Sequence, residues 1–224
     1  MKKNIIISLG GSIVVPDEID TNYVKKFKQL ILQNLKNYNF ILIVGGGKYA
    51  RKYQEAGKRI NIKSDELDWL GIGVSQNNAW FINYAFDGKT PEKIHLQPEK
   101  LTFTKPVQVA GGWKPGWSTD YVATQFAIKN NIDTVINLSN IDYVYDKDPN
   151  KYSNAKKKKE LNWVEFQKIV GTKWSPGMNA PFDPVATKIA KQHNLTVVCM
   201  NGKKLANISA YLRGKSFIGT KICS

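Results

Sequence analysis

Glycine clusters follow three of the apolar runs of this 224-residue chain. The clusters are Gly10-Gly11, Gly45 to Gly47 and Gly111-Gly112, and the run Ile5 to Leu9 before the first cluster is typical of a buried β-strand. Backbone N–H groups in such loops can point directly at phosphate oxygens. None of the clusters has the spacing of a P-loop or of a G-x-G-x-x-G dinucleotide site. The clusters therefore predict an anion site of a different construction, in preference to plain turns.

The elements that must position these loops alternate between strands and helices. Strands are expected at 4–9, 40–44, 106–110, 134–138, 195–200 and 216–222. Helices are expected at 20–36, 48–59, 64–86, 120–130 and 203–213, with further helices opened by Asn162 and Asp183. The stretches 87–105, 139–159 and 171–182 are expected to be mainly loops, the first with a short strand.

This alternation predicts an α/β fold of one domain, residues 1–224. The expected architecture is a three-layer sandwich in which helices cover both faces of a mainly parallel central sheet. Ligands of such sheets bind at the carboxyl ends of the strands. We therefore expect the three glycine clusters to gather at one edge of the sheet.

The composition argues against several classes of protein. Two histidines and two cysteines are too few for a zinc site or a disulfide framework. The chain has no run of 18 apolar residues, so no membrane span is expected. We expect a reduced, cytoplasmic protein without a membrane partner.

The formal net charge of +15 has two interpretations. A basic chain suits nucleic-acid binding, but its arginines are limited to Arg51, Arg59 and Arg213, and arginine is the residue that reads base edges. We therefore favour a small anionic ligand and expect no specific nucleic-acid partner. A basic nucleic-acid-binding protein remains the alternative, and its affinity would fall steeply with salt.

Seven segments of the chain resemble the amino acid kinase family, and within it the archaeal-type uridylate (UMP) kinases. They occur in order along essentially the whole chain: SLGGSIVVP (8–16), VGGGKYAR (44–51), ELDWLGIG (66–73), GGWKPGWSTD (111–120), SNIDYVYDKDP (139–149), FDPVATKIA (182–190) and FIGTKI (217–222). The resemblance implies an amino acid kinase-like fold and transfer of phosphate from ATP to UMP, with Mg²⁺. It also implies a hexameric homo-oligomer, an acceptor-binding part at roughly 1–135 and an ATP-binding part at roughly 136–224.

The resemblance also assigns residues to three sites. The residues implied for ATP are Gly10, Gly11, Ser12, Gly47, Arg51, Ser139, Tyr145 and Asp148. The residues implied for UMP are Gly46, Asp68, Trp113, Lys114, Pro115, Gly116, Trp117, Ser118 and Thr119. Lys188, Asp120 and Asp183 would form the catalytic centre, with Asp120 orienting Lys188. No residue is assigned as a direct metal ligand, because nucleotide phosphates usually supply much of the coordination of Mg²⁺.

Some of these residues also have a structural interpretation. Asp120 and Asp183 both suit a helix start, where a side-chain oxygen accepts backbone N–H groups. By position alone Lys188 is one surface lysine among many. Trp113 and Trp117 either pack on a base or cover their own loop, and we favour packing on a base.

The first glycine loop departs from the broader family at Ser8, where many relatives carry lysine two residues before the glycine pair. Gly10, Gly11 and Ser12 would then offer N–H and hydroxyl donors to phosphate. The positive charge must come from elsewhere, and we expect Lys188, Arg51 and Lys48 to supply it.

The chemistry of the acceptor leaves alternatives open. A phosphomonoester has a second pKa of about 6, so it is mostly a dianion at neutral pH and needs no general base. The lack of a histidine in the motifs therefore fits a phosphate acceptor. Gln76 stands where some relatives would carry arginine, which weakens the assignment of UMP. The alternatives are another small-molecule kinase of this fold, for isopentenyl phosphate or an amino acid, or a non-catalytic nucleotide- or oxyanion-binding protein.

Overall fold

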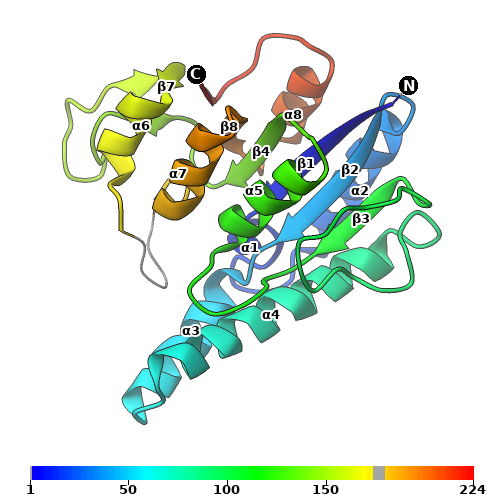
Figure 1. Cartoon of the computed structure of the whole chain (residues 1–224), viewed down its shortest axis with the longest axis horizontal. Coiled ribbons are helices and arrows are strands. Elements are labelled where there is room, and N and C mark those ends of the chain that lie inside the picture. The colour runs from blue at the N-terminus through cyan, green and yellow to red at the C-terminus, as the bar shows by residue number, and fades with distance from the viewer. Residues whose placement is uncertain (1, 174–179) are drawn as a thin grey trace.

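The structure, a computed structural model, describes residues 2–173 and 180–224 (Figure 1). Half of the expected loop 171–182 lies outside the described residues. At the centre is a seven-stranded sheet in the order β3-β2-β1-β4-β8-β9-β7. Its strands are β1 (Lys3–Leu9), β2 (Tyr38–Val44), β3 (Val107–Ala110), β4 (Thr134–Ser139), β7 (Glu160–Asn162), β8 (Thr196–Asn201) and β9 (Thr220–Cys223). Neighbouring strands are parallel except β8 and β9, which confirms the predicted mainly parallel sheet.

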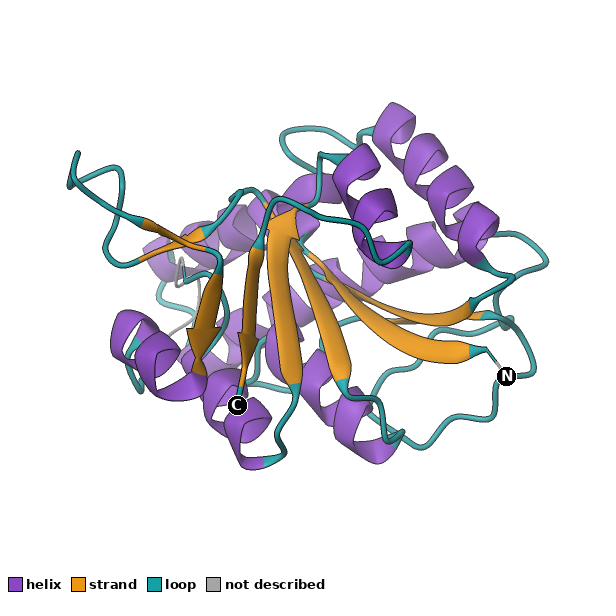
Figure 2. Cartoon of the chain, turned by 90° about the horizontal axis from the view of Figure 1, so that it is seen from above, coloured by secondary structure: helices purple, strands orange, loops and turns teal. Residues whose placement is uncertain are grey.

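Helices cover both faces of this sheet, as the predicted three-layer sandwich requires (Figure 2). The core on one face includes α2 (Thr21–Asn34), α4 (Ser64–Ala85) and α8 (Leu205–Leu212). The core on the other includes α5 (Thr119–Lys129), α6 (Trp163–Val170) and α7 (Pro184–Gln192). Successive side chains of a strand point to opposite faces, so Ile5 and Ile7 of β1 enter the first core and Ile6 enters the second.

Two further helices surround the first glycine loop. The short α1 (Gly11–Val14) follows β1 directly, and α3 (Gly47–Arg59) starts in the glycine cluster after β2. Figure 1 shows α3 and α4 lying side by side and extending away from the sheet. Their close approach uses Gly57, where a Cβ would lie 2.6 Å from Leu67 Cδ2.

Three local predictions were wrong in detail. The stretch 87–105 contains no strand, only an isolated bridge from His95 to Ala110. The stretch 139–159, expected as loop, carries a hairpin of β5 (Val144–Tyr145) and β6 (Lys157–Lys158). The sequence did not indicate it, because strands of two residues show no periodicity. The last strand is shorter than predicted and begins at Thr220.

The glycine clusters gather at one edge of the sheet, as predicted. The first two are in direct contact, since a Cβ on Gly11 would lie 2.3 Å from the Gly45 carbonyl oxygen. The third packs on α4, where the Gly112 N–H donates to Ser75 Oγ at 2.7 Å. The parallel strands β1, β2 and β3 bring all three loops to their shared carboxyl end.

Among the described helices, none is both long and apolar enough to cross a membrane.

Candidate functional site

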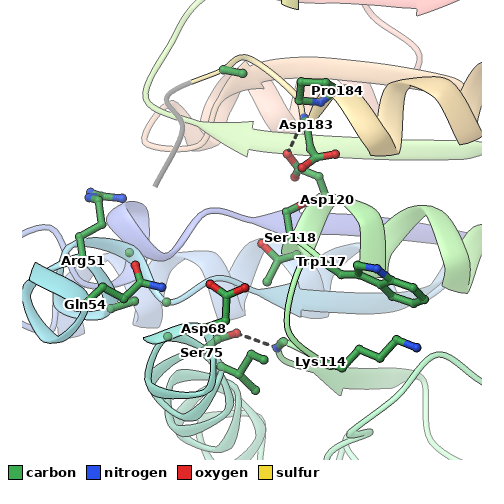
Figure 3. Close-up of a pocket in the computed structure, with 18 residues that line it drawn as sticks. Arg51, Gln54, Asp68, Ser75, Lys114, Trp117, Ser118, Asp120, Asp183 and Pro184 are labelled. Carbon is green, nitrogen blue, oxygen red and sulfur yellow. Dashed lines mark hydrogen bonds between the residues drawn. The ribbon is translucent and has the colours of Figure 1, made fainter. Parts of the chain in front are cut away.

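A cavity of about 250 Å³ opens at this edge of the sheet (Figure 3). Its walls come from α3, from α4, from the loop 111–119 and from the starts of α5 and α7. The residues assigned to UMP that line it are Gly46, Asp68, Lys114, Trp117, Ser118 and Thr119. Gly47 and Arg51, assigned to ATP, and the catalytic candidates Asp120 and Asp183 line it too. Residues predicted from four separate segments therefore meet in one cavity.

The N-termini of three helices form part of the cavity wall. They belong to α3, which starts at Gly47, to α5, which starts at Thr119, and to α7, which starts at Pro184. The first N–H groups of a helix lack partners inside the helix, and its dipole favours an anion there. The Ser118 side chain caps α5 and the Asp183 side chain caps α7, but α3 follows Gly46 and has no side chain to cap it. The start of α3 is therefore the part of the wall best suited to phosphate.

Asp120 occupies the junction of three elements at the floor of the cavity. Its Oδ1 accepts a hydrogen bond from Ser8 Oγ at 2.9 Å, and its Oδ2 accepts the backbone N–H of Asp183 at 3.2 Å. Burial, and then repulsion from Asp183, raise the pKa of Asp120 to about 7. The two hydrogen bonds oppose that rise, so the carboxyl is poised to titrate near neutral pH.

Asp183 combines a capping role with a place in the cavity wall. Its Oδ1 accepts the Ala186 N–H at 2.6 Å, which confirms the predicted helix start, with Pro184 at the first helical position. Burial raises the pKa of Asp183, while hydrogen bonds from backbone N–H groups and Ser118 oppose the shift. Two carboxyls with raised pKa values in one cavity are typical of functional sites.

The loop 111–119 is fastened to α4 at several points. The Gly116 N–H donates to Asp68 Oδ2 at 2.7 Å, and Gln76 Nε2 donates to the Gly112 carbonyl at 3.0 Å. Gly116 has a φ of +81°, a conformation suited to glycine. Gln76 is not among the residues that line the cavity, so it holds the loop from behind.

An aromatic cluster stiffens the same loop. The rings of Trp113 and Trp117 pack edge to face with their centroids 4.4 Å apart. The centroid of the Tyr121 ring lies 4.3 Å from that of Trp117. Lys114 Nζ lies 4.0 Å from the centroid of the Trp117 ring and 4.6 Å from that of Trp113. Trp117 lines the cavity, whereas Trp113 and Pro115 are not among its lining residues, so Trp113 packs within the loop. The Lys114 ammonium is held by the indole rings rather than aimed into the cavity (Figure 3).

The residues assigned to the ATP phosphates adjoin the cavity on the side of β1. Arg51 Nη2 donates to Ser12 Oγ at 3.3 Å, so a guanidinium does reach the first glycine loop. Lys48 is paired with Asp17 instead. Lys188 lies on α7 with an exposed side chain and is not among the lining residues. Of the three expected suppliers of charge, Arg51 is thus the one that contacts the loop.

The residues assigned to adenosine lie at the end of β4, which is Ser139, and in the segment that follows it. The Gly10 N–H donates to the Leu138 carbonyl at 2.9 Å, which places Gly10 beside Ser139. Ser139 Oγ is buried and has no hydrogen-bond partner among the described residues, so it is free to meet a ligand. Tyr145 lies in β5, and the exposed Asp148 accepts the Asn150 N–H in a turn.

Comparisons with known proteins agree with this architecture. A sequence profile of the amino acid kinase family matches residues 3–201. The chain belongs to the amino acid kinase family. It is 32% identical to the uridylate kinase of Thermoplasma volcanium over 99% of this chain and 98% of that protein.

Solved structures of the amino acid kinase fold resemble the chain over its whole length. The crystal structure of uridylate kinase from Archaeoglobus fulgidus aligns with a TM-score of 0.83 and 30% identity, covering 100% of both chains. The UMP kinase of Ureaplasma parvum aligns with a TM-score of 0.76 at 19% identity, which supports the fold alone.

Sequence reasoning missed two polar residues of the site and one contact between residues that it had named. Ser75 joins two walls, because its Oγ donates to the Val44 carbonyl at 2.7 Å while accepting from Gly112. Gln54 lines the cavity and donates to the Leu67 carbonyl. Ser75 lies seven residues after Asp68, and Gln54 seven after Gly47, so helical periodicity could have found both. Nothing in the sequence pairs Ser8 with Asp120, since the two are 112 residues apart.

Proposed function

We propose that the protein transfers the γ-phosphate of ATP to UMP, giving UDP and ADP, in pyrimidine nucleotide synthesis. The observation that carries this proposal is the cavity in which the N-termini of α3, α5 and α7 meet. A cavity walled by helix N-termini favours phosphate groups. The family membership and the uridylate kinases among the relatives support the same reaction.

The cavity suits a phosphate acceptor rather than a hydroxyl acceptor. Phosphoryl transfer depends mainly on positioning and on neutralising charge. The second phosphate pKa of UMP is about 6, so its oxygen is already a nucleophile near neutral pH. The described lining residues supply N–H groups, the Arg51 guanidinium and the three carboxyls of Asp68, Asp120 and Asp183, without a histidine base.

In this proposal the first part of the chain, roughly 1–135, holds UMP. Gly46, Asp68 and the segment Trp113 to Thr119 surround the acceptor, with Trp117 against the base and the N–H groups of Ser118 and Thr119 near its phosphate. The stiff aromatic cluster and the bond from Gly116 to Asp68 support a preformed acceptor site. Lys114 contributes by fixing the loop, since its ammonium packs on the indole rings.

ATP would lie across the end of β1, with its adenosine in the second part, roughly 136–224. Gly10, Gly11, Ser12, Gly47 and Arg51 would surround its phosphates. Ser139, Tyr145 and Asp148 would surround its adenosine. The bond from Arg51 to Ser12 supports the placement of the phosphates. The buried hydroxyl of Ser139, which has no hydrogen-bond partner among the described residues, supports the placement of the adenosine.

Lys188 would reach the transferring phosphate only by extending from α7 toward the cavity. Its exposed side chain is free to do so, and it starts one turn after Pro184 in the cavity wall. Asp120 and Asp183 would set the negative potential that attracts this ammonium. The hydrogen-bond partners of Asp120 in the structure are Ser8 and Asp183, so it does not orient Lys188 directly.

Mg²⁺ would enter as part of the ATP complex and neutralise charge on the phosphates. Within the described residues, no three His, Cys, Asp or Glu side chains lie close enough to hold a metal ion. Both oxygens of Asp120 and one of Asp183 already accept hydrogen bonds. These side chains therefore fit a Mg²⁺ ion that takes most of its ligands from phosphate and water.

An acceptor panel tests the proposed function. With ATP and Mg²⁺, we expect turnover of UMP to exceed that of CMP, dTMP, isopentenyl phosphate and acidic amino acids. Formation of UDP is measured by chromatography and ADP by a coupled assay. Equal or greater turnover of another acceptor would refute the assignment of UMP, and turnover of none would favour a non-catalytic binding protein.

We also propose that the protein is a homo-oligomer, a hexamer as the family resemblance implies. The helix pair α3 and α4 extends from the sheet and exposes large apolar side chains: Tyr53 (55% exposed), Ile60 (73%) and Trp69 (54%). Large exposed apolar side chains mark protein interfaces where they gather in a patch. Light scattering after gel filtration should give a multiple of 25.3 kDa, and Trp69→Glu should lower it. A monomeric wild-type protein would contradict the proposal.

A further inference from the structure

Ser8 is a buried polar residue in an otherwise aliphatic strand. Its exposed fraction is 2%, and its neighbours in β1 are Ile5, Ile6, Ile7 and Leu9. Ser8 points to the same face as Ile6, which is the face covered by α5. A buried hydroxyl in such a place needs a partner, and Ser8 has one in Asp120 Oδ1 at 2.9 Å.

The Asp120 carboxyl is held from two sides by neutral donors. Ser8 of β1 donates to one oxygen and the backbone N–H of Asp183, before α7, donates to the other. Asp120 itself belongs to the first turn of α5. The two bonds therefore fix the orientation of a carboxyl that lines the cavity, and they tie three elements together at this point.

We propose that Ser8 is a positioning residue of the phosphotransfer site, whose hydroxyl holds the Asp120 carboxylate in the orientation that serves the transferring phosphate and its cations. This inference rests on the proposed function. Asp120 contacts the cavity and Ser8 acts through it. Ser8 thus orients a carboxylate of the site from the position where many relatives of the broader family carry lysine.

The charged surroundings of Asp120 explain why one neutral donor matters. Among the described residues, the Asp183 carboxyl at the start of α7 raises the pKa of Asp120, and Asp120 in turn raises the pKa of the Cys199 thiol of β8. Neither is a cation. A largely buried carboxylate beside another carboxyl depends on its hydrogen bonds to stay ionised. Loss of the Ser8 bond should therefore favour the protonated form of Asp120.

The pH dependence of kcat/KM for UMP tests this role. In Ser8→Ala we expect the acid limb of the profile to move to higher pH by about one unit, the scale of one hydrogen bond to a charged group. Because free UMP has the same pKa in both assays, a difference between the two pH profiles reports on a group of the protein. In an Asp120→Asn background, Ser8→Ala should leave the profile unchanged. An unshifted limb in Ser8→Ala would overturn the proposal.

A second readout does not need turnover. The ¹³C resonance of the Asp120 carboxyl, assigned through Asp120→Asn, should titrate about one unit higher in Ser8→Ala than in the wild-type protein. If UMP is not phosphorylated but this midpoint shifts, the proposed function fails and the positioning of Asp120 by Ser8 stands. If the midpoint does not shift, the positioning role fails whatever the acceptor is.

Two variants separate this role from a general loss of packing. Thr90→Ala removes a buried hydroxyl with a comparable 3.0 Å bond, to the Asn83 carbonyl, outside the cavity. It should cost stability without moving the pH profile or the Asp120 midpoint. If Ser8→Ala does not fold, Ser8→Cys keeps the side-chain size with a weaker donor, and the same shift, reduced, is expected. An unmoved midpoint in Ser8→Cys would then overturn the proposal.

Discussion

Arg51 illustrates how the site obtains charge from a residue far from the glycine loop in sequence. Its guanidinium donates to Ser12 and lines the cavity, while Lys48 is engaged by Asp17. Arginine offers several N–H donors in a fixed plane, which suits phosphate. The cation that contacts the first loop in the structure is therefore supplied from α3.

Replacing Arg51 by alanine should raise the KM for ATP by about 10- to 100-fold, the scale of a lost charge-assisted hydrogen bond. Steady-state kinetics with varied ATP measures it. Arg51→Lys should recover part of the loss, because lysine keeps the positive charge but lacks the planar set of N–H donors of the guanidinium. Arg59→Ala, at the far end of the same helix, is the control. An unchanged KM in Arg51→Ala would remove this residue from the ATP site.

Lys188 provides a second test at the residue scale. Its replacement by alanine should lower kcat by at least about 10²-fold, as for loss of one electrostatic stabiliser of the transition state. Lys191→Ala, on the same helix near its C-terminal end, controls for surface charge. Near-normal turnover in Lys188→Ala would mean that the exposed side chain does not reach the reacting phosphate.

Asp120 should also make stability depend on pH. Its pKa is raised from 3.8 to about 7 in the folded protein, so the folded state holds this proton more tightly than the unfolded state. Between these values the free energy of unfolding falls as pH rises, and the loss is nearly complete about one unit above pH 7. Asp120→Asn removes this term, so its Tm relative to wild type should increase from pH 4.5 to 7.5 by up to about 6–12 °C, equivalent to about 3 kcal/mol.

The pH series for Asp120→Asn needs a matched control. Asp87→Asn removes an exposed carboxyl outside the cavity and keeps the same change in side chain. The Tm difference for Asp120→Asn should rise with pH relative to this control. A difference that is flat with pH would show that Asp120 is ionised throughout.

At the scale of elements, the start of α3 depends on the backbone of Gly47. Its φ is +65°, and a Cβ there would lie 2.5 Å from the Gly11 carbonyl carbon. The atoms that this Cβ would meet belong to the backbone, so no change of side-chain rotamer could make room for it. The contact between two strand ends therefore requires glycine on both sides.

Gly47→Ala should lower the free energy of unfolding by about 1–3 kcal/mol or more and weaken ATP binding. Gly73→Ala is the matched control, since this exposed glycine lies within α4 with nothing within 4 Å of a Cβ. It should be stabilising by about 0.5–1 kcal/mol, because alanine is the better helix former. Denaturant titrations measure both changes. Equal stability of Gly47→Ala and wild type would contradict the close packing of the two loops.

At the scale of the whole molecule, the chain carries a net charge of +15, and the two substrates proposed for it are anions. A positive field raises the rate of encounter with anions, and salt screens it over about 10 Å at 0.1 M. Raising KCl from about 50 to 300 mM should lower kcat/KM for both nucleotides several-fold and change kcat much less. Sucrose at matched osmolality is the control. A flat salt response would show that the charge lies away from the site.

The sequence by itself was sufficient for the layers of the fold. Buried strands such as Ile5 to Leu9 and amphipathic helices carry their own periodicity, and glycines after strands indicate loops at one edge of a parallel sheet. Asp183-Pro184 as a helix start was predictable for the same reason, since capping involves neighbours in the chain. Short elements such as α1 and β5 were not, because they contain too few residues to show a period.

The contacts within the site were decided only by the tertiary structure. The sequence could nominate Arg51, Lys48 and Lys188 as suppliers of charge, but their order in the chain does not say which one meets Ser12. Likewise Ser8 and Asp120 are brought within 2.9 Å by the packing of α5 on β1, across 112 residues of chain. A hydrogen bond depends on atomic positions within a fraction of an ångström, whereas periodicity places only faces of helices and strands.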